Sequence, residues 1–367
     1  MSSDRFIPQM EPWFGVEEKE ALNQYMEEGG WLTEFRRTAE FEKNIAEYTG
    51  ARHCIVVNNG TISLTLIALA AGIKPGDEVI VPNYTMIATP NSIKMIGGVP
   101  VFVDVEPETL CMDINQAKQA ITSRTKAIFF VTSNGRYPIA GMEAFQKLCA
   151  DNNLFLLEDA AQSLGSRYPD GKHQGTVGLA GSFSFSSPKV ISTGQGGAIV
   201  TNSDEIAKSL RKLKDFGRSS GGNDIHDSIG YNFKFTELQA VIGNEQMKKL
   251  PFRVGRKREI LKKYRLLLEE VKEITFFHQD LSCTTPWFID VFTERREELM
   301  DYLKRNGIGT RPMYPPINKQ IAYQIPGDHP VSDKIGIHGL WLPSASQLSD
   351  AQIQFICEQI SDFYNKN

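Results

Sequence analysis

Hydrophobic residues recur with different spacings along the chain. In the first 50 residues, acidic and apolar positions alternate with helical spacing in VEEKEALNQYMEEGG and FRRTAEFEKNIAEYTG, and each segment ends in glycine. Short β-branched or aromatic runs follow, at residues 53–57, 78–82, 101–105, 127–131, 154–159, 183–185 and 198–202. Segments with helical spacing separate most of these runs, among them 61–71, 114–121 and 141–151. This alternation predicts an α/β fold with a mainly parallel sheet.

Beyond about residue 235 the pattern becomes mostly helical. TELQAVIGNEQMKKL and RVGRKREILKKYRLLLEEV are long and amphipathic, and Pro251 lies between them, where we expect a helix to break. A strand-like segment at 286–293, a helical one at 294–307 and a terminal helix from Ser349 indicate a small α+β domain. We therefore assign residues 1–250 to an N-terminal segment with a large α/β domain, and 251–367 to a small C-terminal α+β domain.

The amino-acid composition limits which binding partners and which cellular compartment we expect. The 367 residues include 40 basic and 44 acidic ones, a formal charge of -4, without a clustered basic tract. Nucleic acid and anionic membrane surfaces are therefore not expected as partners. The five cysteines stand singly, as is typical of a reducing cytoplasm. The N-terminus lacks the apolar run of a signal peptide, and no later run approaches the roughly 20 residues of a membrane helix, so we expect a cytoplasmic protein.

Several common site motifs are absent from the sequence. Neither GxxxxGK[ST] nor HExxH occurs, and the six histidines are scattered without metal-ligand spacing, so we expect no metal site. The segment GQGGAIV at 194–200 is rich in glycine but lacks the GxGxxG spacing. It also runs into a strand-like segment, whereas a dinucleotide-binding loop follows a strand and opens a helix.

Three segments carry candidate chemistry. NNGT (58–61) follows a strand and opens an apolar helix, so N–H groups and the Thr61 hydroxyl could bind an anion, although an ordinary N-cap gives the same pattern. Asp159 ends a strand, at the sheet edge where open α/β folds bind ligands, or caps a following helix. Lys189 stands alone among hydroxyls and glycines in GSFSFSSPKVISTGQGG, where the ordinary alternative is a solvated surface lysine.

Together these segments contain the parts that a pyridoxal phosphate site needs. Lysine bonds to the cofactor aldehyde, while N–H and hydroxyl donors hold the phosphate. A carboxylate beside the pyridine nitrogen keeps that nitrogen protonated, because a nearby negative charge favours the charged form. The protonated ring accepts electrons when the substrate loses a proton, and the released lysine can move that proton.

Longer motifs resemble a known family. LEDAAQSLGS, the lysine segment and GYNFKFTELQAVIG (230–243) are similar to the DegT/DnrJ/EryC/StrS sugar aminotransferases, a branch of the fold type I pyridoxal phosphate enzymes. The resemblance covers nearly the whole chain, from NNGT through VPNYTMIATPNSI and GGVPVFVDV to WLPS (341–344). It implies a three-layer α/β sandwich of the aspartate aminotransferase type with a small α+β C-terminal domain. It also implies a homodimer with shared active sites.

The resemblance further implies roles for individual residues. Lys189 would bind the cofactor covalently and act as acid and base, and Asp159 would pair with the pyridine nitrogen. Gln162 would hydrogen-bond the phenolic oxygen of the ring. The phosphate would be held by Gly60, Thr61 and Ser184, and by Asn232 of the second subunit.

Two segments depart from the family pattern. Many relatives carry an aromatic residue against the cofactor ring where this chain has Met86, which would supply a softer apolar contact. Tyr84, two residues earlier, is a candidate substrate residue. A histidine-containing stretch of the family is replaced by VTSNGRYP (131–138). Arg136 in this stretch could bind a glutamate carboxylate or a nucleotide phosphate through its planar donor fork, or lie in a surface loop.

The implied reaction is transfer of the amino group of L-glutamate to the keto sugar of a nucleoside diphosphate. TRPMYPP (310–316) and the KREI helix (257–260) are most similar to enzymes that aminate carbon 4 of 4-keto-6-deoxyhexoses, as perosamine and viosamine synthases do. Arg311 and Tyr314 are candidate substrate residues, whereas Gln162 differs from the glutamate frequent in the perosamine group. Alternatives are a 3-keto sugar aminotransferase, a dehydratase, whose family members carry histidine in place of Lys189, and a non-catalytic cofactor-binding module.

Overall fold

The computed structural model describes residues 6–219 and 224–365, and its larger part is built on a seven-stranded sheet. In chain order the strands are β1 (His53–Val57), β2 (Glu78–Pro82), β3 (Val99–Val103), β4 (Thr125–Val131), β5 (Phe155–Asp159), β6 (Ala180–Ser184) and β7 (Gly197–Thr201). Their order across the sheet is β1-β7-β6-β5-β4-β2-β3. Within this sheet β7 runs opposite to the other strands, and all pairs that do not include β7 are parallel, which confirms the predicted mainly parallel sheet.

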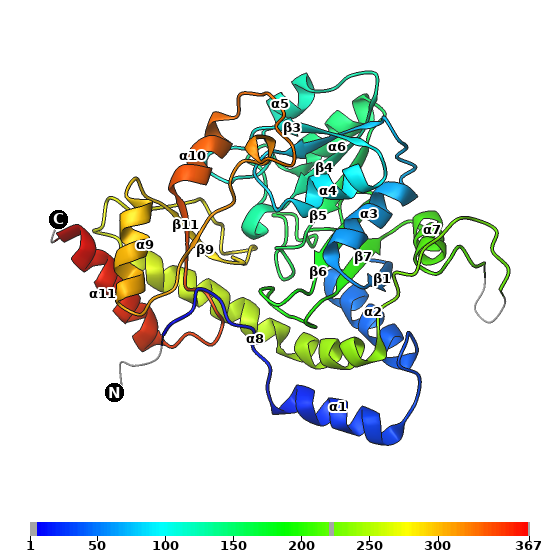
Figure 1. The fold of residues 1–367 in the computed structure, drawn as a ribbon, viewed down its shortest axis with the longest axis horizontal. Coiled ribbons are helices and arrows are strands. Elements are labelled where there is room, and N and C mark those ends of the chain that lie inside the picture. The colour runs from blue at the N-terminus through cyan, green and yellow to red at the C-terminus, as the bar shows by residue number, and fades with distance from the viewer. Residues whose placement is uncertain (1–5, 220–223, 366–367) are drawn as a thin grey trace.

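Helices cover both faces of this sheet, as Figure 1 shows. Because successive strand side chains point to opposite faces, Ile55 and Val57 pack with α3 (Gly60–Ala70) and α7 (Asp204–Lys214), whereas Val56 packs with α2 (Arg36–Thr49) and α8 (Glu237–Leu267). The helices of this part are α1 (Val16–Glu28), α2 (Arg36–Thr49), α3 (Gly60–Ala70), α4 (Ala88–Met95), α5 (Ile114–Gln119), α6 (Met142–Asp151), α7 (Asp204–Lys214) and α8 (Glu237–Leu267). The predicted three-layer sandwich is thus confirmed.

A smaller unit follows, with a four-stranded antiparallel sheet in the order β10-β11-β9-β8. Its strands are β8 (Thr275–Phe276), β9 (Ile289–Phe292), β10 (Arg311–Pro312) and β11 (Gly339–Leu342). The accompanying helices are α9 (Arg296–Arg305), α10 (Pro330–His338) and α11 (Asp350–Asn365). Leu299, Leu340 and Ile356 share one buried core between this sheet and its helices. This is the predicted small α+β unit, at the left of Figure 1.

The prediction that a helix breaks at Pro251 is wrong. Helix α8 continues from Glu237 to Leu267 with Pro251 inside it. Proline removes one N–H and thus one helical hydrogen bond, whereas α8 is held along its length by contacts with α1 and α2 in its first part and with α11. Figure 1 shows α8 passing from beneath the large sheet to the small unit. The predicted boundary after residue 250 therefore falls within a continuous helix.

The first described residues of the chain contact the small unit. Ile7 forms a bridge with Ile308, and Gln9 donates a side-chain hydrogen bond to the Leu342 carbonyl oxygen.

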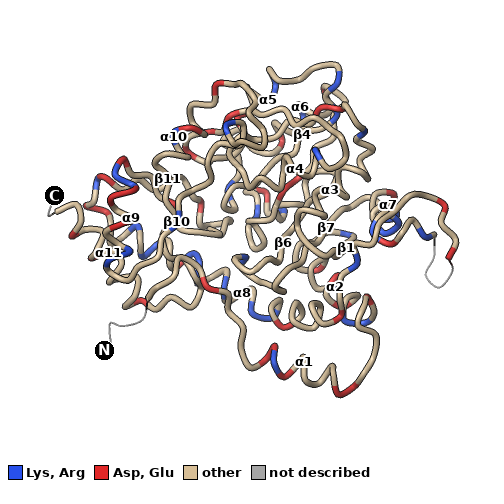
Figure 2. The backbone as a smooth tube through the Cα atoms, viewed as in Figure 1, with Lys and Arg blue, Asp and Glu red and all other residues tan. Residues whose placement is uncertain are grey.

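Figure 2 shows basic and acidic residues interspersed along the described chain. Within residues 6–219 and 224–365, no helix combines the length and apolar character that a bilayer span requires.

Candidate active site

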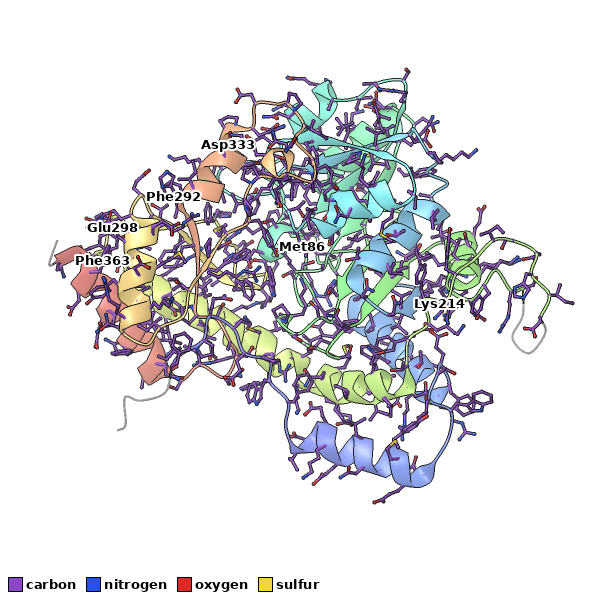
Figure 3. All side chains as sticks on the ribbon, in the orientation of Figure 1. Met86, Lys214, Phe292, Glu298, Asp333 and Phe363 are labelled. Carbon is purple, nitrogen blue, oxygen red and sulfur yellow. The ribbon has the colours of Figure 1, made fainter. Side chains whose placement is uncertain are left out.

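A cavity of about 650 Å³ lies at the carboxyl edge of the parallel strands. Asp159 and Ser184 are the last residues of β5 and β6, and α3 begins shortly after β1, so the topology brings their side chains to one edge. Nine residues predicted from sequence line the cavity, namely Gly60, Thr61, Met86, Asp159, Gln162, Ser184, Lys189, Arg311 and Tyr314. Met86, labelled in Figure 3, marks this region near the centre of the molecule.

A second and larger cavity, of about 1050 Å³, lies in the small unit and beside it. Its lining is mainly apolar and includes Leu268, Phe277 and Ile335. None of the residues predicted to carry chemistry lies there. We therefore place the chemistry in the smaller cavity, where a lysine and a buried carboxylate occur together.

One end of the smaller cavity is the N-terminus of α3. Asn59 caps this helix, since its side-chain oxygen accepts a hydrogen bond from the Ile62 N–H at 2.9 Å. A Cβ atom on Gly60 would lie 2.9 Å from Cβ of Ser184, so this close approach requires glycine. The N-terminus of a helix carries partial positive charge, and the hydroxyls of Thr61 and Ser184 lie beside it. This set of donors suits a phosphate group.

Asp159 lies buried in the wall of the cavity. Its carboxylate accepts hydrogen bonds from the Thr89 hydroxyl at 2.6 Å and from the Ala161 N–H at 3.1 Å. Burial raises its pKa, and both hydrogen bonds and the charge of Lys189 oppose that rise. Residues 160–165 form turns, so the alternative that Asp159 caps a following helix is wrong. A cation bound beside this carboxylate would favour its ionised form.

Lys189 projects into the same cavity and is only partly exposed. Its Nζ lies 4.2 Å from the centre of the Trp287 ring. Burial among protein atoms lowers its pKa from 10.5 to about 8, and the negative charge of Asp159 opposes this change. Lys189 is therefore not the solvated surface group of the ordinary alternative. The lowered pKa increases the fraction of uncharged amine near neutral pH, and the uncharged amine is the form that attacks a carbonyl carbon.

Gln162 is oriented by Asn134, a residue that the sequence did not single out. The Gln162 side-chain oxygen accepts a hydrogen bond from the Asn134 N–H at 2.7 Å, which leaves the amide NH₂ as the donor available to a ligand. The side chain of Asn134 also accepts from the Phe288 N–H at 2.7 Å and donates to the Phe288 carbonyl at 2.9 Å. One residue thus joins Gln162 to the small unit.

Two predicted substrate residues lie outside the cavity lining. Tyr84 is buried behind Tyr314, with ring centres 6.0 Å apart. Arg136 is neither a surface-loop arginine nor a cavity residue, because its guanidinium is buried and pairs with Asp290, donating at 2.9 Å from one nitrogen. Its Nε donates to the His278 carbonyl at 2.8 Å. The planar donor fork is therefore used within the protein, and we remove Arg136 from the candidate site.

Asn232 was predicted to act from the second subunit. In its own chain it is exposed and outside the cavity lining. Its role therefore stays a prediction.

Sequence reasoning missed Thr89 and Trp287 as well as Asn134. Thr89 donates to Asp159 across a separation of 70 residues, and no local pattern indicates that contact. The signal for Trp287 was a strand-like segment with one tryptophan, which predicts a buried strand but no contact with Lys189.

Comparisons with known proteins show which family this chain resembles in sequence and fold. A model of the DegT/DnrJ/EryC1/StrS aminotransferase family matches residues 14–361. A GDP-perosamine synthase of Escherichia coli O157:H7 is 36% identical over 98% of this chain and 99% of that protein. A GDP-perosamine synthase of Vibrio cholerae is 32% identical over the same shares. The crystal structure of a DegT DnrJ EryC1 StrS aminotransferase from Brucella abortus aligns with a TM-score of 0.88 at 30% identity, covering 95% of both chains.

Proposed function

The chain belongs to the DegT/DnrJ/EryC1/StrS aminotransferase family, and from this premise we propose that it moves the amino group of L-glutamate to a nucleotide-linked 4-keto-6-deoxyhexose. It is a pyridoxal phosphate-dependent aminotransferase. The product would be a 4-amino-4,6-dideoxy sugar nucleotide of the GDP-perosamine or dTDP-viosamine type, used for surface polysaccharide such as lipopolysaccharide O-antigen. The observation that carries the proposal is the single cavity that holds Lys189, Asp159 and the N-terminus of α3.

The residues of the cavity fit pyridoxal phosphate. The N-terminus of α3, with Thr61 and Ser184, suits the phosphate, and Asp159 suits a protonated ring nitrogen. Gln162 offers an amide donor to the phenolic oxygen, and Met86 an apolar contact to the ring. When bound, the cofactor supplies a conjugated cationic ring that accepts the electrons of a broken C–H bond.

Lys189 uses the same nitrogen for two tasks. Its amine binds the cofactor in the resting enzyme, and once displaced by the amino group of the substrate it moves a proton between atoms of the reacting molecule. Lys189 must therefore exist both as an amine and as an ammonium ion while glutamate reacts, and again while the keto sugar reacts. The lowered pKa of about 8 makes both forms accessible near neutral pH.

Arg311 and Tyr314 are proposed to contact the substrates. Glutamate and a nucleoside diphosphate sugar are both anions, and the exposed Arg311 lies at the cavity, 5.4 Å from the centre of the Trp341 ring. A guanidinium can donate two parallel hydrogen bonds to a carboxylate or phosphate. Burial raises the pKa of Tyr314, so its phenol stays protonated and can donate to a sugar oxygen.

An amination assay with several keto sugars tests the function. We expect purified protein with L-glutamate to aminate a 4-keto-6-deoxy sugar nucleotide among the GDP-, dTDP- and UDP-linked forms, with the GDP-linked form preferred as the names of the two relatives suggest. Amination of 3-keto sugars alone would contradict the assignment to carbon 4. Loss of water from the sugar without uptake of nitrogen would favour the dehydratase. If the purified protein does not bind the cofactor, every one of these reactions is excluded.

The proposal includes a homodimer in which Asn232 reaches the phosphate site of the other subunit. Asn232 is exposed outside its own cavity, and large apolar side chains are exposed around the connection from α1 to α2, at Met26, Trp31, Leu32 and Phe35. Exposed apolar patches commonly mark interfaces, and a two-fold axis would complete both sites. Molar mass in solution should be twice that of the 41.1 kDa chain. A fully active monomer would contradict this arrangement.

A cytoplasmic location is also part of the proposal. All five cysteines are free in the structure, which is usual in a reducing compartment.

A further inference from the structure

A tryptophan of the small unit covers the reactive lysine. Lys189 Nζ lies 4.2 Å from the centre of the Trp287 ring. The indole N–H of Trp287 donates a 2.8 Å hydrogen bond to the carbonyl of Pro188, the residue before the lysine. Trp287 lines the active-site cavity and is only 3% exposed. One side chain therefore contacts both the amine and the backbone of the loop that carries it.

Trp287 is itself held in place on several sides. Its ring stacks on Phe288 with centres 3.8 Å apart and meets Trp341 edge-on at 5.8 Å. The carbonyl of Trp287 accepts a 2.6 Å hydrogen bond from the fully buried Lys257. The N–H and the carbonyl of the next residue, Phe288, are both hydrogen-bonded to the side chain of Asn134. These contacts present the indole face to Lys189 Nζ in a fixed geometry.

The electrostatics of an indole face suit a lysine that carries protons. The face of the ring attracts a cation, more strongly where water is excluded, and offers no comparable attraction to a neutral amine. Asp159 also favours the ammonium form through its charge, but its oxygens are engaged by Thr89 and Ala161 and its charge would be shared with a bound pyridinium. Trp287 attracts the ammonium ion without bringing a second carboxylate into the cavity.

The geometry points to Trp287 as a catalytic residue that stabilises Lys189 in its protonated form, while the lysine carries a proton between the substrate and the cofactor. This role rests on the proposed function, because it is the transfer of an amino group that requires the lysine to carry protons. Lys189 takes up one proton where a C–H bond breaks and gives up one proton where the new C–H bond forms. The lysine therefore gains no net proton, and Trp287 undergoes no covalent change.

The pH dependence of cofactor capture by the cofactor-free protein tests this role. Only the uncharged amine attacks the aldehyde, so the capture rate reports the fraction of Lys189 that is deprotonated. Because burial lowers the pKa to about 8, the wild-type rate should rise with pH through a midpoint at about 8 and level off above it. If Lys189 had its ordinary pKa of 10.5, the capture rate would still be rising with pH well above 8.

Substitutions of Trp287 distinguish attraction of the ammonium ion to the ring from mere exclusion of water by the side chain. Trp287→Leu should lower the midpoint by about one pH unit, because the ammonium form loses its partner. Trp287→Phe, which keeps a weaker ring face, should lower it by less. Trp341→Phe is the control from the same aromatic cluster, and because it keeps an aromatic ring at the edge of Trp287 it should leave the midpoint close to the wild-type value. If Trp287 merely excluded water, Trp287→Leu would admit water and raise the midpoint instead.

An unchanged or raised midpoint in folded Trp287→Leu would overturn the assignment. Should that variant not fold, Trp287→Phe decides alone, with a midpoint below the wild-type value supporting the role and any other value opposing it. Failure of the wild-type protein to capture the cofactor at any pH would contradict the proposed function itself. The two failures are therefore distinguishable.

Discussion

Lys189→Ala is expected to abolish transamination, and Lys189→Arg is expected to do the same. Alanine has no nitrogen to bind the cofactor or move a proton. Arginine keeps a positive charge, but its guanidinium stays protonated at any usable pH and cannot attack a carbonyl or accept a proton. We expect kcat to fall by about 10⁴-fold or more in both variants, measured as 2-oxoglutarate released from L-glutamate in the presence of the keto sugar.

Lys214 provides the matched control for this loss. Lys214 is buried at the end of α7 and does not line the cavity, and its Nζ pairs with Glu34 at 2.7 Å. Figure 3 shows it well apart from Met86. Lys214→Met should lower the free energy of unfolding, because the partly buried Glu34 loses its partner, while kcat of the folded protein stays near the wild-type value. Near wild-type activity in Lys189→Ala would refute the role of Lys189.

Asp159→Asn should have the second-largest effect. The amide has nearly the same size, but it carries no charge to keep the ring nitrogen protonated, so the electron-accepting power of the cofactor falls. Loss of one partner of a buried charge pair points to a decrease in kcat of about a thousandfold, equivalent to about 4 kcal/mol. Cofactor affinity should fall as well, and titration of the apoprotein with pyridoxal phosphate, followed by absorbance, measures that change.

The adjacent Glu158 allows a strict comparison. Its buried carboxylate accepts hydrogen bonds from the Tyr168 hydroxyl and from the N–H groups of Gly175, Val177 and Gly178, and it does not line the cavity. Glu158→Gln should lower stability and leave the turnover of the folded enzyme largely intact. An equal loss of turnover in both variants would show that damage to β5, rather than loss of the Asp159 charge, causes the defect.

The positions of the strands could be predicted because each one is a local pattern. Residues 53–57 and 78–82 became β1 and β2 with the predicted bounds, since short apolar runs between turns favour strands that are buried on both faces. Pro251 shows where a local rule fails. The rule considers only the helical hydrogen bond that proline removes. It omits the packing of α8 against α1, α2 and α11, because that packing depends on segments far away in sequence.

The same distinction holds in the site. Asp159 and Lys189 could be predicted because each lies in a short motif with a characteristic context. Arg136 could not be placed, because a planar donor fork suits the carboxylate of a substrate as well as that of Asp290, 154 residues further along the chain. The partner of Trp287 could not be predicted either, since its contact with Lys189 exists only after the small unit packs on the large sheet.

The reaction with L-glutamate alone, compared between the wild-type enzyme and Lys189→Ala, tests directly whether Lys189 carries the transamination. Cofactor-loaded protein is mixed with L-glutamate alone, while the visible absorption of the cofactor and the 2-oxoglutarate formed are followed together. The wild-type enzyme should release one 2-oxoglutarate per site as the absorption band disappears, and Lys189→Ala should release none. Release at the wild-type rate by Lys189→Ala, or no release by the loaded wild-type enzyme, would show that Lys189 does not carry a transamination.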